Sequence, residues 1–151
     1  MIVSFCGHAS FCATDALKQQ LLSVLDKEIG EETVSFYLGG YGGFDEFAYT
    51  CCKKYQENHP NARLVFVTPY ITEAYQRKNL PILQKQYDEI LYPALEGKPL
   101  RFAISYRNKW MAENADLMIA YVLHDSGGAY QTYSHAKRKG KTVINLADHG
   151  T

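Results

Sequence analysis

The sequence predicts an α/β fold with a doubly wound, mainly parallel sheet and helices on both faces. Short apolar runs rich in β-branched and aromatic residues alternate with longer stretches whose apolar residues have helical spacing. The short runs are continuously apolar, as expected for parallel strands that are buried on both faces. A length of 151 residues corresponds to one domain, which we assign to residues 1–151.

The first half of the chain predicts three strands and two helices. The first helix is capped by Thr14 or Asp15 and ends at Gly30, and leucine and valine side chains recur within it at helical spacing. The second helix follows a glycine-rich loop and stops near residues 58–61. Its apolar stripe consists of Phe44, Phe47, Ala48, Cys51 and Tyr55. The strands are expected at residues 2–6, 33–38 and 63–68.

The second half predicts further alternation of helices and strands. Residues 72–79 predict a short polar helix, which precedes a strand that a proline stops. Two helices and two strands follow, and Gly140 marks the end of the last helix. The expected elements are a strand at 87–93, a helix at 101–115, a strand at 116–122, a helix at 127–140 and a strand at 142–147.

The composition argues against several classes of protein. Sixteen Lys and Arg residues balance sixteen Asp and Glu residues, whereas a nonspecific nucleic-acid interface needs a basic face. We therefore expect nucleic acid not to be a partner. No apolar stretch approaches the roughly 20 residues that span a bilayer, and the N-terminus lacks the basic region of a signal peptide. The spacing of the four cysteines and five histidines fits no metal or redox motif, so we expect a reduced, cytoplasmic protein without metal or cofactor.

The predicted fold also indicates where a ligand binds. In open parallel sheets, ligands lie outside the carboxyl ends of the strands. The loops at this edge are residues 7–11, 39–43, 68–73 and 123–128. Gly7 and His8 follow the first strand directly, and His8 is a candidate phosphate donor or general acid, although a polar loop role is equally open.

Two of these loops are rich in glycine and lead into helices. Free backbone N–H groups at a helix N-terminus favour phosphate or carboxylate, so both loops are candidate anion sites; the alternative is that both are tight turns. Tyr41 lies inside the first loop, where it can cover a nucleobase or pack on a neighbouring loop. The candidate residues are Gly39, Gly40, Tyr41, Gly42 and Gly43 in the first loop, and Ser126, Gly127, Gly128 and Thr132 in the second.

Residues 107–132 resemble the core of the SLOG superfamily, which groups the lonely-guy phosphoribohydrolases with the DNA-processing A proteins. The residues that match in order are Arg107, Met111, Ala115, Asp116, Gly127 and Gly128. The whole chain also resembles the small YpsA-like branch, through "GH" after the first strand, "LGGYGGFDEFA" after the second and "RNKWM" before the fifth.

The resemblance implies a Rossmann-like domain that binds nucleotides or nucleotide-derived ligands. Arg107 then binds phosphate or carboxylate with Asn108 beside it. The lonely-guy enzymes cleave the N-glycosidic bond of a nucleoside 5′-monophosphate with an arginine and a motif glutamate. That motif is Pro-Gly-Gly-x-Gly-Thr-x-x-Glu, and residues 38–46 match it with Glu46 at the glutamate position. The loop at 126–132 lacks both the third glycine and the glutamate.

We expect a sensor or sequestering domain for a nucleotide or an ADP-ribose-like ligand. The alternative is an N-glycosidase, such as a phosphoribohydrolase or a deoxyribosyltransferase-like enzyme, with Glu46 or Asp45 as the catalytic carboxylate. Both acids also suit a helix N-terminus without any catalytic role. Single-stranded DNA binding, as in the DNA-processing A relatives, is disfavoured by the neutral charge. Related folds are often dimers, so a homodimer is a further expectation.

Overall fold

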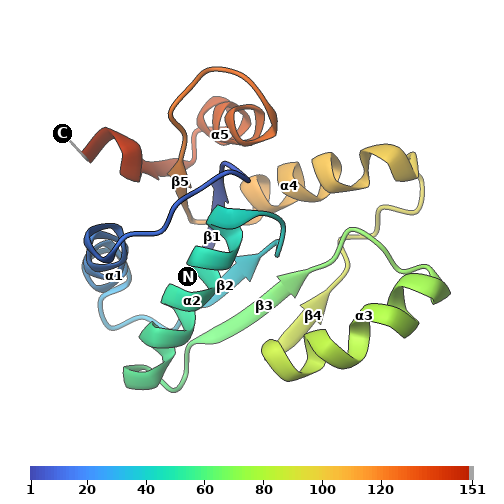
Figure 1. Cartoon of the computed structure of the whole chain (residues 1–151), viewed down its shortest axis with the longest axis horizontal. Helices are drawn as coiled ribbons and strands as arrows, with labels where there is room; N and C mark the ends of the chain where they lie inside the picture. Colours follow the sequence, from blue (N-terminus) through green and yellow to red (C-terminus); the bar gives the residue numbers. More distant parts are fainter. Residues whose placement is uncertain (150–151) are drawn as a thin grey trace.

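The computed structural model describes residues 1–149 and contains one wholly parallel six-stranded sheet (Figure 1). The strand order is β4-β3-β2-β1-β5-β6. The strands are β1 (Ile2–Gly7), β2 (Ser35–Leu38), β3 (Arg63–Val67), β4 (Glu89–Leu91), β5 (Leu117–Tyr121) and β6 (Thr142–Asn145). The predicted doubly wound α/β fold is confirmed.

Alternate residues of β1 show that helices cover both faces of the sheet. Val3 and Phe5 pack with the buried residues of α1 (Asp15–Ile29) and α2 (Gly43–Asn58). Cys6 instead packs with Ala112 of α4 (Ala103–Asn114) and Ala136 of α5 (Gly128–Arg138). Since successive strand residues point to opposite faces, the two helix pairs lie on opposite sides.

The ends and the apolar stripes of α1 and α2 follow the sequence signals. Thr14 accepts a hydrogen bond from the N–H of Leu17 through its hydroxyl oxygen, and Gly30 ends α1 with φ of 59°. Such a side-chain cap is worth about 1 kcal/mol. Every residue of the predicted stripe on α2 is buried in the larger core cluster. Both helices were therefore correctly predicted.

The segment after β3 differs from the prediction. The helix α3 (Glu73–Gln86) is longer than the expected residues 72–79 and runs through Pro81. Pro81 is exposed, so water can satisfy the carbonyl that loses its helical partner. The strand expected at 87–93 is the three-residue β4, which begins after Tyr87 and Asp88. The Tyr87 N–H donates to the last turn of α3, and the Asp88 carboxylate accepts a hydrogen bond from the Leu64 N–H. No residue of α3 is buried.

Two short 3-10 helices complete the described chain. The expected helix at 101–115 consists of η1 (Leu100–Phe102) followed by α4, and η2 (Leu146–His149) follows β6. Within residues 1–149, no helix combines the length and apolar character needed to cross a bilayer.

The order of the strands places a crevice beside β1. From β1 the chain proceeds outward through β2 and β3 to β4, and then α4 returns it to β5 on the other side of β1. The loops that follow β1 and β5 therefore leave in opposite directions. This reversal is the position at which open α/β sheets bind their ligands.

Candidate ligand-binding site

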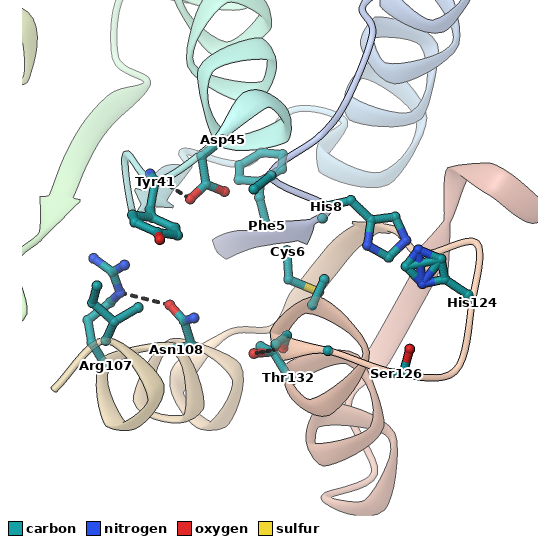
Figure 2. Close-up of a pocket in the computed structure, with 16 residues that line it drawn as sticks. Phe5, Cys6, His8, Tyr41, Asp45, Arg107, Asn108, His124, Ser126 and Thr132 are labelled. Carbon is teal, nitrogen blue, oxygen red and sulfur yellow. Dashed lines mark hydrogen bonds between the residues drawn. The ribbon is translucent and has the colours of Figure 1, made fainter. Parts of the chain in front are cut away.

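A cavity of about 270 Å³ lies at this crevice, at the carboxyl ends of the strands (Figure 2). Asp45 and Tyr41 reach it from the start of α2 and the preceding loop, and Arg107 and Asn108 reach it from α4. The cavity brings together these predicted residues: Gly7, His8, Tyr41, Asp45, Arg107, Asn108, Ser126, Gly127, Gly128 and Thr132. Its lining does not include Gly39, Gly40, Gly42, Gly43 or Glu46.

Arg107 is 1% exposed and is one of the largest fully buried side chains. Its Nη1 donates to the carbonyl oxygens of Gly39, at 3.1 Å, and Val67, at 2.7 Å, just where β2 and β3 end. Its Nε donates to Asn108 Oδ1 at 2.8 Å. Among residues 1–149, Nη2 has no hydrogen-bond partner. A buried guanidinium therefore presents a free donor in the wall of the cavity.

Asp45 faces the same cavity and has an altered acidity. Burial raises the pKa of its carboxyl group from 3.8 to about 6, against the opposing effects of the Tyr41 N–H and the positive charge of Arg107. Its Oδ2 accepts a hydrogen bond from Tyr41 N at 2.9 Å. Asp45 and Arg107 form no direct ion pair among the described contacts. A carboxyl group with a pKa near neutrality can accept or donate a proton.

The N-terminus of α2 cannot hold a phosphate in the way the sequence suggested. The N–H groups of Gly43 and Phe44 donate to the carbonyl oxygens of Ala9, at 2.8 Å, and His8, at 3.3 Å. A Cβ atom added at Gly42 would lie 2.7 Å from the Ala9 Cα. The glycines at 42 and 43 are therefore explained by close packing of residues 8–11 on this turn, and the N–H groups of Gly43 and Phe44 already have carbonyl partners.

The N-terminus of α5 is not covered by another segment in this way. Its N-cap Gly127 has φ of 91°, which strongly favours glycine, and no side chain of the described residues caps the helix. A Cβ atom added at Gly127 or Gly128 would meet no other described residue within 4 Å. Ser126, Gly127, Gly128 and Ala129 line the cavity here. The two helix starts therefore differ: the Gly43 and Phe44 N–H groups of α2 have carbonyl partners, whereas no described side chain caps α5.

Thr132 lines the cavity but is not a free donor, since its hydroxyl donates to the Gly128 carbonyl oxygen at 3.1 Å.

The ring of His8 already has partners within the protein. Its Nε2 accepts a hydrogen bond from Leu123 N–H at 2.9 Å, and its ring packs against His124 at 4.1 Å between centroids, tilted by 31°. Burial and the neighbouring His124 lower the pKa of His8. Nε2 of His8 therefore does not serve as the phosphate donor or general acid that the sequence suggested.

Glu46 is exposed and lines two grooves on the outer side of α2 instead of the cavity. Of the two acids proposed from the sequence, only Asp45 can therefore act on a molecule in the cavity. Part of the lining was not predicted from the sequence. Phe5 and Cys6 are the last residues before Gly7, so the rule that ligands meet strand ends would have found them. Ile104 had no sequence signal beyond lying one turn before Arg107.

Within residues 1–149, no three His, Cys, Asp or Glu side chains gather where they could share a metal ion.

Comparisons with known proteins connect this fold to solved structures. No family model matches the chain. No curated protein matches it either. DNA processing protein A from Helicobacter pylori, described for its single-stranded DNA binding mode, matches with a TM-score of 0.60 and 17% identity over 95% of this chain and 63% of that one. DNA processing protein A from Streptococcus pneumoniae matches with a TM-score of 0.61 and 18% identity over 93% of this chain and 48% of that one.

The chain thus spans about half to two-thirds of the length of these two proteins. At such low identity the likeness shows the fold alone. The SLOG superfamily and its YpsA-like branch remain predictions from the sequence. The chain shares the Rossmann-like α/β fold of the DNA-processing A proteins.

Proposed function

We propose that the cavity binds a nucleotide or a nucleotide-derived, ADP-ribose-like ligand, with a phosphate group on the N-terminus of α5. One observation carries this proposal: an uncapped helix N-terminus and the free Nη2 of the buried Arg107 line the same cavity. A helix N-terminus stabilises an anion through its unpaired N–H groups and its dipole. The exposed hydroxyl of Ser126 lies beside these N–H groups as a further donor.

Tyr41 supplies the surface for a base. Its side chain is 62% exposed at the cavity, while its backbone N–H is fixed by Asp45. Base-on-aromatic stacking contributes about 1–3 kcal/mol without selecting a particular base. The ligand therefore extends from a phosphate at α5 past Arg107 and Asp45 to a base on Tyr41.

We propose a sensor or sequestering role as the first candidate function, and hydrolysis of the N-glycosidic bond of the ligand as the second. The second candidate is favoured by one observation, the raised pKa of Asp45 in the cavity. In that case Asp45 takes the place that the sequence gave to Glu46. A carboxylate there would activate water or stabilise an oxocarbenium-like centre.

Single-stranded DNA is a further candidate ligand, and it rests on the likeness to DNA processing protein A from Helicobacter pylori. This likeness runs against the expectation, drawn from net charge, that nucleic acid is not a partner. DNA binding would release counterions and weaken steeply with salt, whereas a mononucleotide would show a much weaker salt dependence.

A thermal-shift screen tests the proposal, with each mixture analysed afterwards by mass spectrometry. The probes are the nucleoside 5′-monophosphates, ADP-ribose, ribose 5-phosphate and a single-stranded oligodeoxynucleotide at two salt concentrations. A ligand at 100 times its dissociation constant stabilises the fold by about 2.7 kcal/mol, which corresponds to roughly 5–10 °C. A shift with intact nucleotide supports the sensor. Release of free base supports the glycosidase, and a shift by DNA alone contradicts the proposal.

The variant Gly128→Asp separates phosphate binding from folding. An acidic residue in the first turn of a helix is favourable, and nothing in the described chain stands within 4 Å of a Cβ at this position. The variant should therefore fold normally and lose the shift by every phosphate ligand. Gly97→Asp is the matched control, since it introduces the same charge at another open position away from the cavity. Retained binding in Gly128→Asp would show that α5 does not hold the phosphate.

A further inference from the structure

Arg107 and Asp45 flank one space beside Gly39. A Cβ atom added at Gly39 would lie 3.1 Å from Arg107 Nη2 and 3.2 Å from Asp45 Oδ2. The position of this missing side chain thus adjoins a donor and an acceptor that both line the cavity and form no ion pair among the described residues. An oxygen atom close to this position can hydrogen-bond to both groups, since such bonds are about 2.7–3.0 Å long.

The charges at this space decide which chemical group fits. A phosphate would accept from Arg107 but would be repelled by the Asp45 carboxylate. An amine would donate to Asp45 but could not accept from Arg107. A hydroxyl group accepts from the guanidinium and donates to the carboxylate at the same time. The remaining donors of Arg107 are already used by Gly39, Val67 and Asn108, so only Nη2 is available to a ligand.

We propose that Arg107 and Asp45 hold a ring hydroxyl of the ligand's sugar, and that this contact selects ribose-containing ligands over analogues that lack the hydroxyl. The inference rests on the proposed function and adds the substrate class. The phosphate lies on α5, at the part of the cavity lined by Ser126, Gly127 and Gly128. The guanidinium and the carboxylate then meet the sugar, because they come from α4 and from the start of α2 instead (Figure 2).

Titrations of the wild-type protein with AMP, 2′-deoxy-AMP and 3′-deoxy-AMP test the proposal, with ribose 5-phosphate and 2-deoxyribose 5-phosphate as probes without a base. A hydrogen bond to a buried charged group corresponds to about a 10- to 100-fold change in affinity. We expect at least one deoxy analogue of AMP to bind at least tenfold more weakly than AMP. Equal affinities for AMP and both deoxy analogues would overturn this inference while leaving the proposed function intact. If neither AMP nor ribose 5-phosphate binds, the proposed function itself fails.

Two variants, each with a matched control, identify the residues responsible. Asp45→Ala should reduce AMP affinity to that of the weaker deoxy analogue, whereas Glu46→Ala should not, since it removes the same charge one residue away but outside the cavity. Gly39→Ala places a methyl group about 3 Å from both Arg107 Nη2 and Asp45 Oδ2 and should have the same effect as Asp45→Ala. Gly97→Ala is its control at an open loop position. Unchanged discrimination in Asp45→Ala, with a native circular dichroism spectrum, would also overturn the proposal.

Discussion

At the scale of single residues, Arg107 serves both the architecture and the candidate site. Its Nη1 joins the carboxyl ends of β2 and β3 through the Gly39 and Val67 carbonyl oxygens, while Nη2 stays free. A sequence can identify an arginine in a motif, but not its burial or the carbonyl groups that it meets. These partners depend on how α4 crosses the sheet, which is a tertiary property.

Asp45 should make the stability of the protein depend on pH. Its pKa is raised to about 6 in the folded state, so the folded protein holds the proton more tightly than the unfolded chain. The resulting stabilisation is fully present below the ordinary pKa of 3.8 and is lost as the pH rises through about 6. Each pKa unit corresponds to about 1.4 kcal/mol. Asp45→Asn should therefore raise the free energy of unfolding at pH 7 by about 1–3 kcal/mol.

Urea unfolding of the wild-type protein and Asp45→Asn at several pH values checks this prediction. The difference between the two proteins should shrink as the pH is lowered from 7 towards 4. A difference that stays constant over this range would show that the Asp45 carboxyl group is not destabilised by burial.

Tyr41 should affect binding without affecting stability. Its ring is exposed and has no described aromatic or hydrogen-bonding partner for the side chain, so Tyr41→Ala should change the free energy of unfolding by no more than about 0.5 kcal/mol. Loss of stacking should weaken AMP binding about 5- to 100-fold. Ribose 5-phosphate has no base and should bind both proteins equally in calorimetric titrations. Equal AMP affinities would place the base elsewhere.

At the scale of elements, the two glycine-led helices start with the same backbone geometry in different surroundings. Gly42 has φ of 92° and ψ of 177°, and Gly127 has φ of 91° and ψ of 178°. Alanine costs about 1–3 kcal/mol in this region at either position. At Gly42 it also meets Ala9, whereas Gly127 has open space. Gly42→Ala should therefore destabilise the protein by at least about 1 kcal/mol more than Gly127→Ala in urea unfolding. Similar losses would contradict the packing role of Gly42.

This pair also shows the limit of the sequence at the level of elements. In both segments a strand is followed by a glycine-rich turn and the start of a helix, and the sequence predicted both turns at the correct edge of the sheet. Nothing local distinguishes them, since the difference arises from residues 8–11, which return to cover one helix start and not the other. The length of α3 was missed for a related reason, because exposed surroundings let a helix continue through Pro81.

The segment after β5 should respond to acid through His8. The pKa of His8 is lowered, so its neutral form is favoured in the folded protein; this stabilisation is present above the ordinary value of 6.5 and is lost as the pH falls below it through the lowered pKa. Protonated Nε2 can no longer accept from Leu123 N–H. The hydrogen-exchange protection factor of the Leu123 amide should therefore fall on acidification, and His8→Ala should lack this protection at every pH. A protection factor that does not change with pH in the wild-type protein would show that protonation of His8 does not break its hydrogen bond with the Leu123 N–H.

At the scale of the whole molecule, the wound parallel sheet was predictable because strand composition and helix spacing agree along most of the chain. The sheet in turn places the ends of β1 and β5 together, which the rule for ligand sites in such sheets anticipates. The sequence did not predict that the N-termini of α2 and α5 have different surroundings at that edge. The packing of residues 8–11 pairs the first N–H groups of α2 with carbonyl oxygens, whereas no described side chain caps α5.

The most direct measurement is a ¹H–¹⁵N NMR titration of the protein with AMP. The account predicts large, saturable shifts for the backbone amides of Gly127, Gly128 and Ala129, because they line the cavity at the free helix N-terminus. The amides of Gly43 and Phe44 should change little, since both already donate to carbonyl oxygens. Shifts centred on Gly43 and Phe44, or no saturable shifts at α5, would contradict the claim that this cavity holds a phosphate there.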